Sequence, residues 1–178
     1  MTESLRDDRA PGSPSDLETA DDHRDTVLVP VGLSDDHRVE TLADTAAEVA
    51  GMMQASVRVL HVFTPERYER TVESLYRDPD CRPPADEMVR RVDPVRELTA
   101  ELAPALRSWG MTMDVEGRVG ESVSDEVVAA ARAADAKRII VGGRRRTPVG
   151  KAVFGSTVQD VLLDAPCPVT FVQDGPGY

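Results

Sequence analysis

The chain has 178 residues and a formal net charge of −11, because 32 acidic side chains outnumber 21 lysines and arginines. This length suits one domain with its own core, and the excess of carboxylates argues against nucleic acid or an anionic membrane as a partner. No apolar run reaches the length of a membrane span, and the acidic N-terminus differs from a signal peptide, so we expect a cytoplasmic protein.

Cysteines and histidines are too scattered to suggest a metal site. Cys81 and Cys167 lie far apart, and the three histidines share no ligand spacing. Lysine is also scarce, with only Lys137 and Lys151 beside many arginines. An acidic, lysine-poor surface is typical of halophiles, and GC-rich coding bias explains the same composition.

The N-terminal segment differs in character from the rest of the chain. Residues 1–24 are rich in aspartate, serine and proline without apolar periodicity, which predicts a disordered acidic tail. We expect one domain over residues 25–174, followed by a flexible C-terminus at 175–178.

Short apolar runs alternate with amphipathic segments along the predicted domain. The runs predict strands at 26–31, 56–63, 112–119, 138–141 and 168–172. Apolar residues at helical spacing predict helices at 39–53, 92–109, from 122 to 131, and at 156–164. We expect a turn at 32–36 and, over 64–90, a long loop with a helical turn around 67–76, because four prolines interrupt that stretch. This order predicts an α/β fold with a single open, five-stranded parallel sheet and helices on both faces.

Ligands of such sheets bind at the carboxyl ends of the strands, which directs attention to the turns after Val31 and Val141. The second turn is rich in glycine and arginine and ends where a helix begins at Ser156, so it offers free N–H groups to a phosphate. The spacing from Gly150 to Gly155 resembles a Walker A motif, but Ser156 stands where that motif has lysine. No G-x-G-x-x-G occurs either, so the sequence favours neither a P-loop NTPase nor a dinucleotide-binding enzyme.

From Thr26 to Val172 the sequence resembles the universal stress protein family. The family motif Gly-x2-Gly-x9-Gly-Ser/Thr matches at Gly142, Gly155 and Ser156, with Arg145 in place of the second glycine. Further similarities are the Val-Pro-Val end of the first strand, Leu-His-Val at 60–62, Val-Gly at 119–120 and Pro-Cys-Pro-Val at 166–169. The resemblance implies a Rossmann-like strand order of 3-2-1-4-5.

The resemblance also implies a binding site for ATP, with Mg²⁺ accompanying the nucleotide. The residues it places beside adenine and ribose are Pro30, Gly32 and Val62. The residues it places beside ribose and phosphates are Val141, Gly142, Arg145, Gly155, Ser156 and Thr157. Nucleotide-binding members carry aspartate where this chain has Gly32, so we expect one carboxylate contact to be missing, weaker binding and a less strict choice between ATP and GTP.

Four cations lie between the glycines of the motif: Arg144, Arg145, Arg146 and Lys151. They are candidates for phosphate contacts, and a solvated loop whose arginines pair with surface carboxylates is an equal alternative. For His61, a packing or loop-fixing role is favoured over a catalytic one.

Three functions compete. The first is a stress-response protein that binds ATP as a regulatory ligand without fast turnover, since no base, nucleophile or carboxylate cluster accompanies the glycines. The second is a dimeric interaction protein of the same fold that binds no nucleotide. The third, an ATP pyrophosphatase, would need a phosphate loop after the first strand, which 32–36 does not supply. We expect a homodimer that pairs through the last strand, formed by Val169, Thr170, Phe171 and Val172, because an uncharged edge must be covered.

Overall fold

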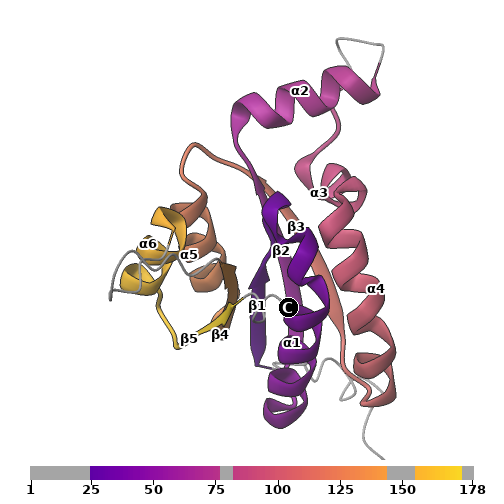
Figure 1. Cartoon of the computed structure of the whole chain (residues 1–178), viewed down its shortest axis with the longest axis vertical. Coiled ribbons are helices and arrows are strands. Elements are labelled where there is room, and N and C mark those ends of the chain that lie inside the picture. The colour runs from indigo at the N-terminus through magenta and orange to yellow at the C-terminus, as the bar shows by residue number, and fades with distance from the viewer. Residues whose placement is uncertain (1–24, 77–81, 144–154, 174–178) are drawn as a thin grey trace, which may run out of the picture.

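The computed structural model describes residues 25–76, 82–143 and 155–173, and these form a sheet with helices around it (Figure 1). The strands are β1 (Thr26–Pro30), β2 (Ser56–Phe63), β3 (Met113–Val119), β4 (Ala136–Gly143) and β5 (Val169–Gln173). They pair in parallel in the order β3-β2-β1-β4-β5, so the predicted fold and strand order are confirmed. The predicted tail at 1–24 and the C-terminus at 175–178 lie outside the described residues.

The central strand β1 is apolar because both of its faces are covered. Val27 and Val29 belong to one core and Leu28 to the other, and all three side chains are fully buried. Alternate side chains of a strand point to opposite faces, so a continuous apolar run is what a two-sided core requires. The sheet therefore has a core on each face.

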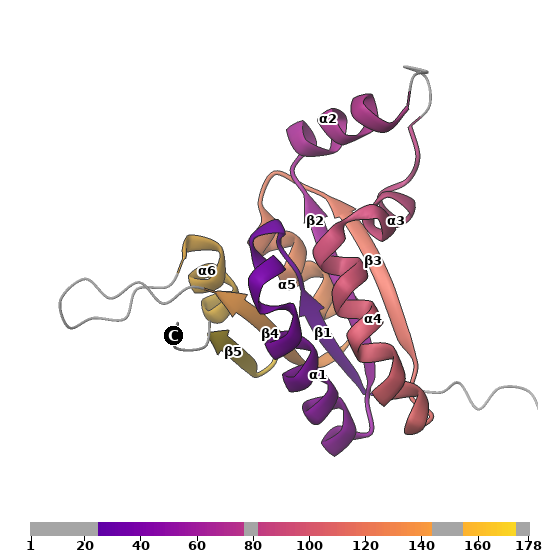
Figure 2. The same cartoon turned by 45° about the vertical axis from the view of Figure 1, so that its right-hand side comes forward.

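Helices cover both faces of the sheet (Figure 2). One core lies under α1 (Val39–Met53) and α4 (Asp93–Ser108), which contribute Leu42, Leu98 and Leu102. The other lies under α5 (Val123–Ala133) and α6 (Ser156–Asp164). No helix among the described residues is long and apolar enough to cross a membrane.

The stretch predicted to be a long loop is largely helical, so the loop prediction is wrong, whereas the expected helical turn around 67–76 lies almost entirely within a helix. It contains α2 (Pro65–Leu75), α3 (Ala85–Met88) and the 3-10 helix η3 (Val89–Arg91). Pro65 lies in the first turn of α2, where proline is tolerated, and the Thr64 hydroxyl accepts a hydrogen bond from the Arg67 N–H. Only Val72 of α2 is buried, which explains why no apolar stripe indicated the helix.

The turn after β1 also differs from its prediction. Residues Leu33–Arg38 form a 3-10 helix, η2, which leads directly into α1. The neighbouring strand β4 continues through Gly142 and Gly143, two residues beyond the predicted strand. Both η2 and this extension of β4 lie at the carboxyl edge of the sheet, so they shape that edge.

The outer edge of β3 is covered by α3. The Gly117 N–H donates to Asp86 Oδ1 at 2.8 Å, and a Cβ on Gly117 would lie 2.2 Å from the Ala85 carbonyl oxygen. This close approach of two backbones requires glycine at 117. It also occupies an edge that would otherwise be open to pairing.

We expect Gly117→Ala to lower the free energy of unfolding by about 1 to 3 kcal/mol, because the added methyl group forces α3 away from β3. Urea unfolding measures the loss. Gly155→Ala is the control, since a Cβ at 155 meets no atom of the described residues within 4 Å. Equal stability of the two variants would show that α3 is not held against β3.

Candidate functional site

A cleft of about 760 Å³ opens at the carboxyl ends of β1, β2 and β4. Eight of the predicted site residues line it: Pro30, Gly32, Val62, Val141, Gly142, Gly155, Ser156 and Thr157. The other four, Arg144, Arg145, Arg146 and Lys151, lie outside the described residues. The structure thus brings the turns after β1 and β4 together, as expected at a point where the strand order reverses.

The cleft also has walls that the sequence interpretation missed. Its polar additions are Ser34, Asp35, Arg38, Thr64 and Arg67, and its apolar additions include Val123, Val127, Val158 and Val161. A sequence signal exists for Asp35 and Arg38. An acidic and a basic residue three positions apart, directly after the first strand, can face each other across one helical turn. No comparable signal marks Arg67.

The bottom of the cleft contains a buried ion pair between Asp35 and Arg38. Arg38 Nη1 donates to Asp35 Oδ1, and Asp35 Oδ2 accepts the Gly32 N–H at 2.6 Å. The two residues are only 6% and 3% exposed. A carboxylate is thus present near Gly32, at position 35, but both of its oxygens are engaged within the protein. The expected loss of a carboxylate contact to the nucleotide stays a prediction.

The two glycines of the motif are explained by different constraints. A Cβ on Gly142 would lie 2.6 Å from Arg38 Cδ and 3.0 Å from Asp35 Oδ1, so packing against the ion pair excludes a side chain there. Among the described residues, a Cβ on Gly155 would have no atom within 4 Å. Gly142 is thus required by the fold, whereas Gly155 leaves open space in the cleft.

That open space adjoins the N-terminus of α6. Gly155 is the N-cap residue and gives α6 no side-chain cap. The first N–H groups of a helix have no partner within it, and the helix dipole adds partial positive charge, so this end suits an anion. Ser156 and Thr157 in the first turn add two hydroxyl groups.

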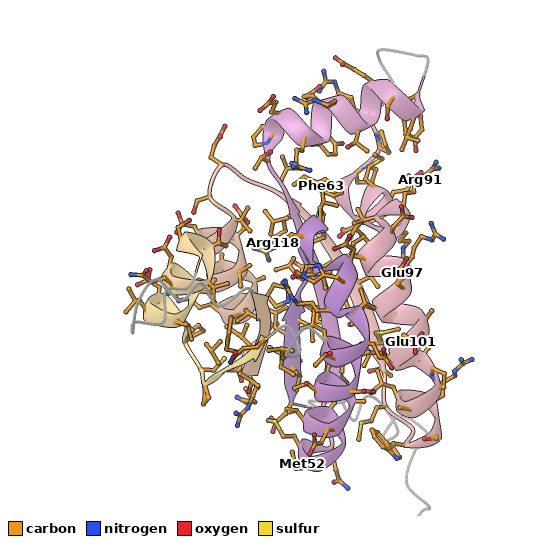
Figure 3. All side chains as sticks on the ribbon, in the orientation of Figure 1. Met52, Phe63, Arg91, Glu97, Glu101 and Arg118 are labelled. Carbon is orange, nitrogen blue, oxygen red and sulfur yellow. The ribbon has the colours of Figure 1, made fainter. Side chains whose placement is uncertain are left out.

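His61 is 4% exposed and fixes the chain around the cleft. Its Nδ1 lies 2.6 Å from the Val31 carbonyl oxygen, and its ring packs edge-on against Phe63 at 4.5 Å. Phe63 lies below α2 in Figure 3. Burial lowers the pKa of His61, so the ring is neutral near pH 7, and Nδ1 carries the proton because a carbonyl can only accept.

Comparison with known proteins identifies the family. A model of the universal stress protein family matches residues 23–173. The chain belongs to the universal stress protein family. A universal stress protein of Mycolicibacterium smegmatis is 35% identical over 68 residues, which are 38% of this chain and 52% of the relative, so the match spans about half of that relative.

Solved structures show the same fold. A universal stress protein from Archaeoglobus fulgidus is 27% identical, with a TM-score of 0.57 over 83% of this chain and 97% of the other. A structure of the Archaeoglobus fulgidus protein in complex with dAMP is 23% identical, with a TM-score of 0.52 over 83% and 96% of the two chains.

We expect Arg38→Met to cost about 3 kcal/mol of stability, because it leaves the Asp35 carboxylate buried without its cation. Chemical unfolding at pH 7 measures the change. Arg58→Met is the matched control: Arg58 pairs with Glu116 at 3.4 Å, with side chains 32% and 22% exposed, and should cost less than about 1 kcal/mol. Similar losses in both variants would contradict a structural role for the buried pair.

Proposed function

We propose that this universal stress protein binds ATP as a regulatory ligand in a stress response, with the phosphates at the N-terminus of α6. The observation that carries the proposal is the open space at Gly155. Packing against the described residues does not require glycine there, and the space lies in the cleft beside N–H groups of the first turn of α6, which have no partner within the helix. A phosphate group has the size and charge to use it.

The remaining walls suit a nucleoside. Val62, Val123, Val127 and Val141 give the cleft apolar surface, and about 760 Å³ falls within the usual range for small-molecule sites. The complex of the Archaeoglobus fulgidus protein with dAMP supports an adenine nucleotide in this fold. Mg²⁺ would arrive with the nucleotide, since the described residues contain no group of three or more histidine, cysteine or acidic side chains placed to hold a metal.

A regulatory role fits the chemistry of the cleft better than rapid turnover. Hydrolysis needs a base that can orient and deprotonate water. The Asp35 carboxylate is engaged with Arg38 and Gly32, and the His61 ring is only 4% exposed, so it is shielded from attacking water. Among the described residues of the cleft, neither group is placed to serve as that base. We therefore infer slow hydrolysis at most.

The alternative, an interaction protein that binds no nucleotide, has one observation in its favour. Gly142 is required by packing against Arg38, so part of the glycine motif would persist without a ligand. The described residues give Gly155 no such structural reason, and this difference favours nucleotide binding.

Gly155→Val decides between these functions. The backbone of Gly155 is extended, with φ −61° and ψ 151°, so valine fits the conformation, and stability should fall by no more than about 1 kcal/mol because valine is a poorer N-cap than glycine. The branched side chain fills the space before α6, and we expect at least about a tenfold loss of ATP affinity by calorimetry. Ala100→Val, at an exposed position of α4, is the control. Absence of ATP binding by the unmodified protein, or equal affinity in Gly155→Val, would favour the alternative.

We also propose a homodimer that pairs through β5. This strand forms the outer edge of the sheet beyond β4. Ile139 N–H donates to the Pro168 carbonyl oxygen, and backbone groups alternate in direction along a strand, so the Val169 N–H points away from β4. Pairing with a second copy around a twofold axis would satisfy these outward groups on both chains.

Val169→Pro tests this interface, because proline removes an outward N–H and leaves the neighbouring bond to β4 in place. We expect the unmodified protein to sediment as a dimer at micromolar concentration and the variant as a monomer. A melting temperature within a few degrees of the unmodified protein shows that the fold is intact. A monomeric parent protein, or a dimeric variant, would refute pairing through β5.

A further inference from the structure

The proposed function places the phosphates of a bound nucleotide at α6. The purine base of that nucleotide must then lie away from α6. β1 separates β4, which precedes α6, from β2, which leads to α2 (Figure 1). The base would therefore lie at the β2 side of the cleft. What it meets there decides which base is accepted.

The backbone between β1 and η2 has little to offer the base. Val31 N–H donates to the Leu60 carbonyl oxygen, and Val31 O accepts from His61. Gly32 N–H donates to Asp35, and Gly32 O accepts the Asp35 N–H at 3.1 Å. These four groups are engaged before any ligand arrives.

Carboxylate acceptors are equally scarce. Asp35 supplies the only carboxylate among the described residues of the cleft, and its two oxygens bind Gly32 and Arg38. Adenine presents an exocyclic amine, which needs an acceptor. The described part of the cleft offers it none of these oxygens freely.

Arg67 supplies hydrogen-bond donors at the β2 side of the cleft, where the purine base would lie. It lines the cleft from the first turn of α2, and its positive charge contributes to the lowered pKa of His61. Within the described residues its guanidinium has no carboxylate partner. The two nearest acidic residues of α2 are taken, since Glu66 accepts from Arg70 at 2.5 Å and Glu69 pairs with Arg82.

The first turn of α2 is held in place by Tyr68. Its ring packs edge-on against Phe63 of β2 at 6.0 Å, and its hydroxyl donates to the Pro83 carbonyl oxygen. Arg67 therefore extends from an anchored turn, and no hydrogen bond to another described residue engages the five N–H donors of its guanidinium.

We propose that Arg67 recognises the purine through its acceptor atoms, N7 and, in guanine, O6. A guanidinium can donate to both atoms of guanine at once, whereas adenine has an amine in place of O6. The cleft then binds GTP at least as tightly as ATP. This inference rests on the proposed function and identifies the base that the same site prefers.

Calorimetric titration of ATP and GTP into the unmodified protein, Arg67→Ala and Arg90→Ala tests the inference. Arg90 is exposed, lies outside this cleft and lines a separate groove beside β3, so its replacement makes the same change in net charge. We expect Arg67→Ala to weaken GTP about tenfold or more and ATP by about threefold or less. Arg90→Ala should leave both affinities unchanged. Arg67→Lys should behave as Arg67→Ala toward GTP, because an ammonium group cannot donate in the same paired geometry.

Three outcomes would overturn the inference. Equal losses for ATP and GTP in Arg67→Ala would place the guanidinium on a phosphate. Unchanged affinities, or an unmodified protein that prefers ATP clearly over GTP, would exclude recognition of the base. If the unmodified protein binds ATP and Gly155→Val abolishes that binding, the proposed function stands, and each of these three outcomes refutes only the role of Arg67. If the unmodified protein binds neither nucleotide, the proposed function fails as well.

Discussion

The buried ion pair between Asp35 and Arg38 joins the carboxyl ends of β1 and β4. Asp35 holds the Gly32 N–H, and Arg38 lies where a side chain on Gly142 would otherwise be. Two charges removed from water are tolerated only while each neutralises the other, so the conformation of η2 and the glycine in β4 depend on the pair. The bottom of the cleft is thus held in one conformation, and the charges of Asp35 and Arg38 compensate each other there.

The neutral bottom of the cleft determines how an acidic protein can attract an anionic ligand. With the charge of Asp35 compensated, the described part of the cleft attracts anions or acceptors at two places. One is the N-terminus of α6 beside Gly155, and the other is the guanidinium of Arg67 on α2. They lie beyond opposite sides of β1 and therefore suit different parts of one elongated ligand. Attraction is local in both cases, which is consistent with a net charge of −11.

The sequence by itself determined the sheet and most of its helices. Apolar runs set β2 at Ser56–Phe63, and helical spacing set α1 and α6 within the predicted bounds. These patterns are readable because each element buries a regular face against the core. For α2 the sequence predicted only a helical turn, because the helix buries only Val72 and its stability depends on capping and on contacts such as Tyr68 with Phe63. Such contacts leave no periodic signal.

The tertiary structure decided what the individual site residues do. The motif presents Gly142 and Gly155 as equivalents, and only their surroundings show that one accommodates Arg38 while the other leaves space. Likewise, the sequence shows many arginines but not which are paired, because the partners of Arg38, Arg70 and Arg82 depend on how helices and loops fold. Local sequence specifies which segments are buried. The distances across the cleft, and hence its chemistry, arise only when segments remote in the chain meet.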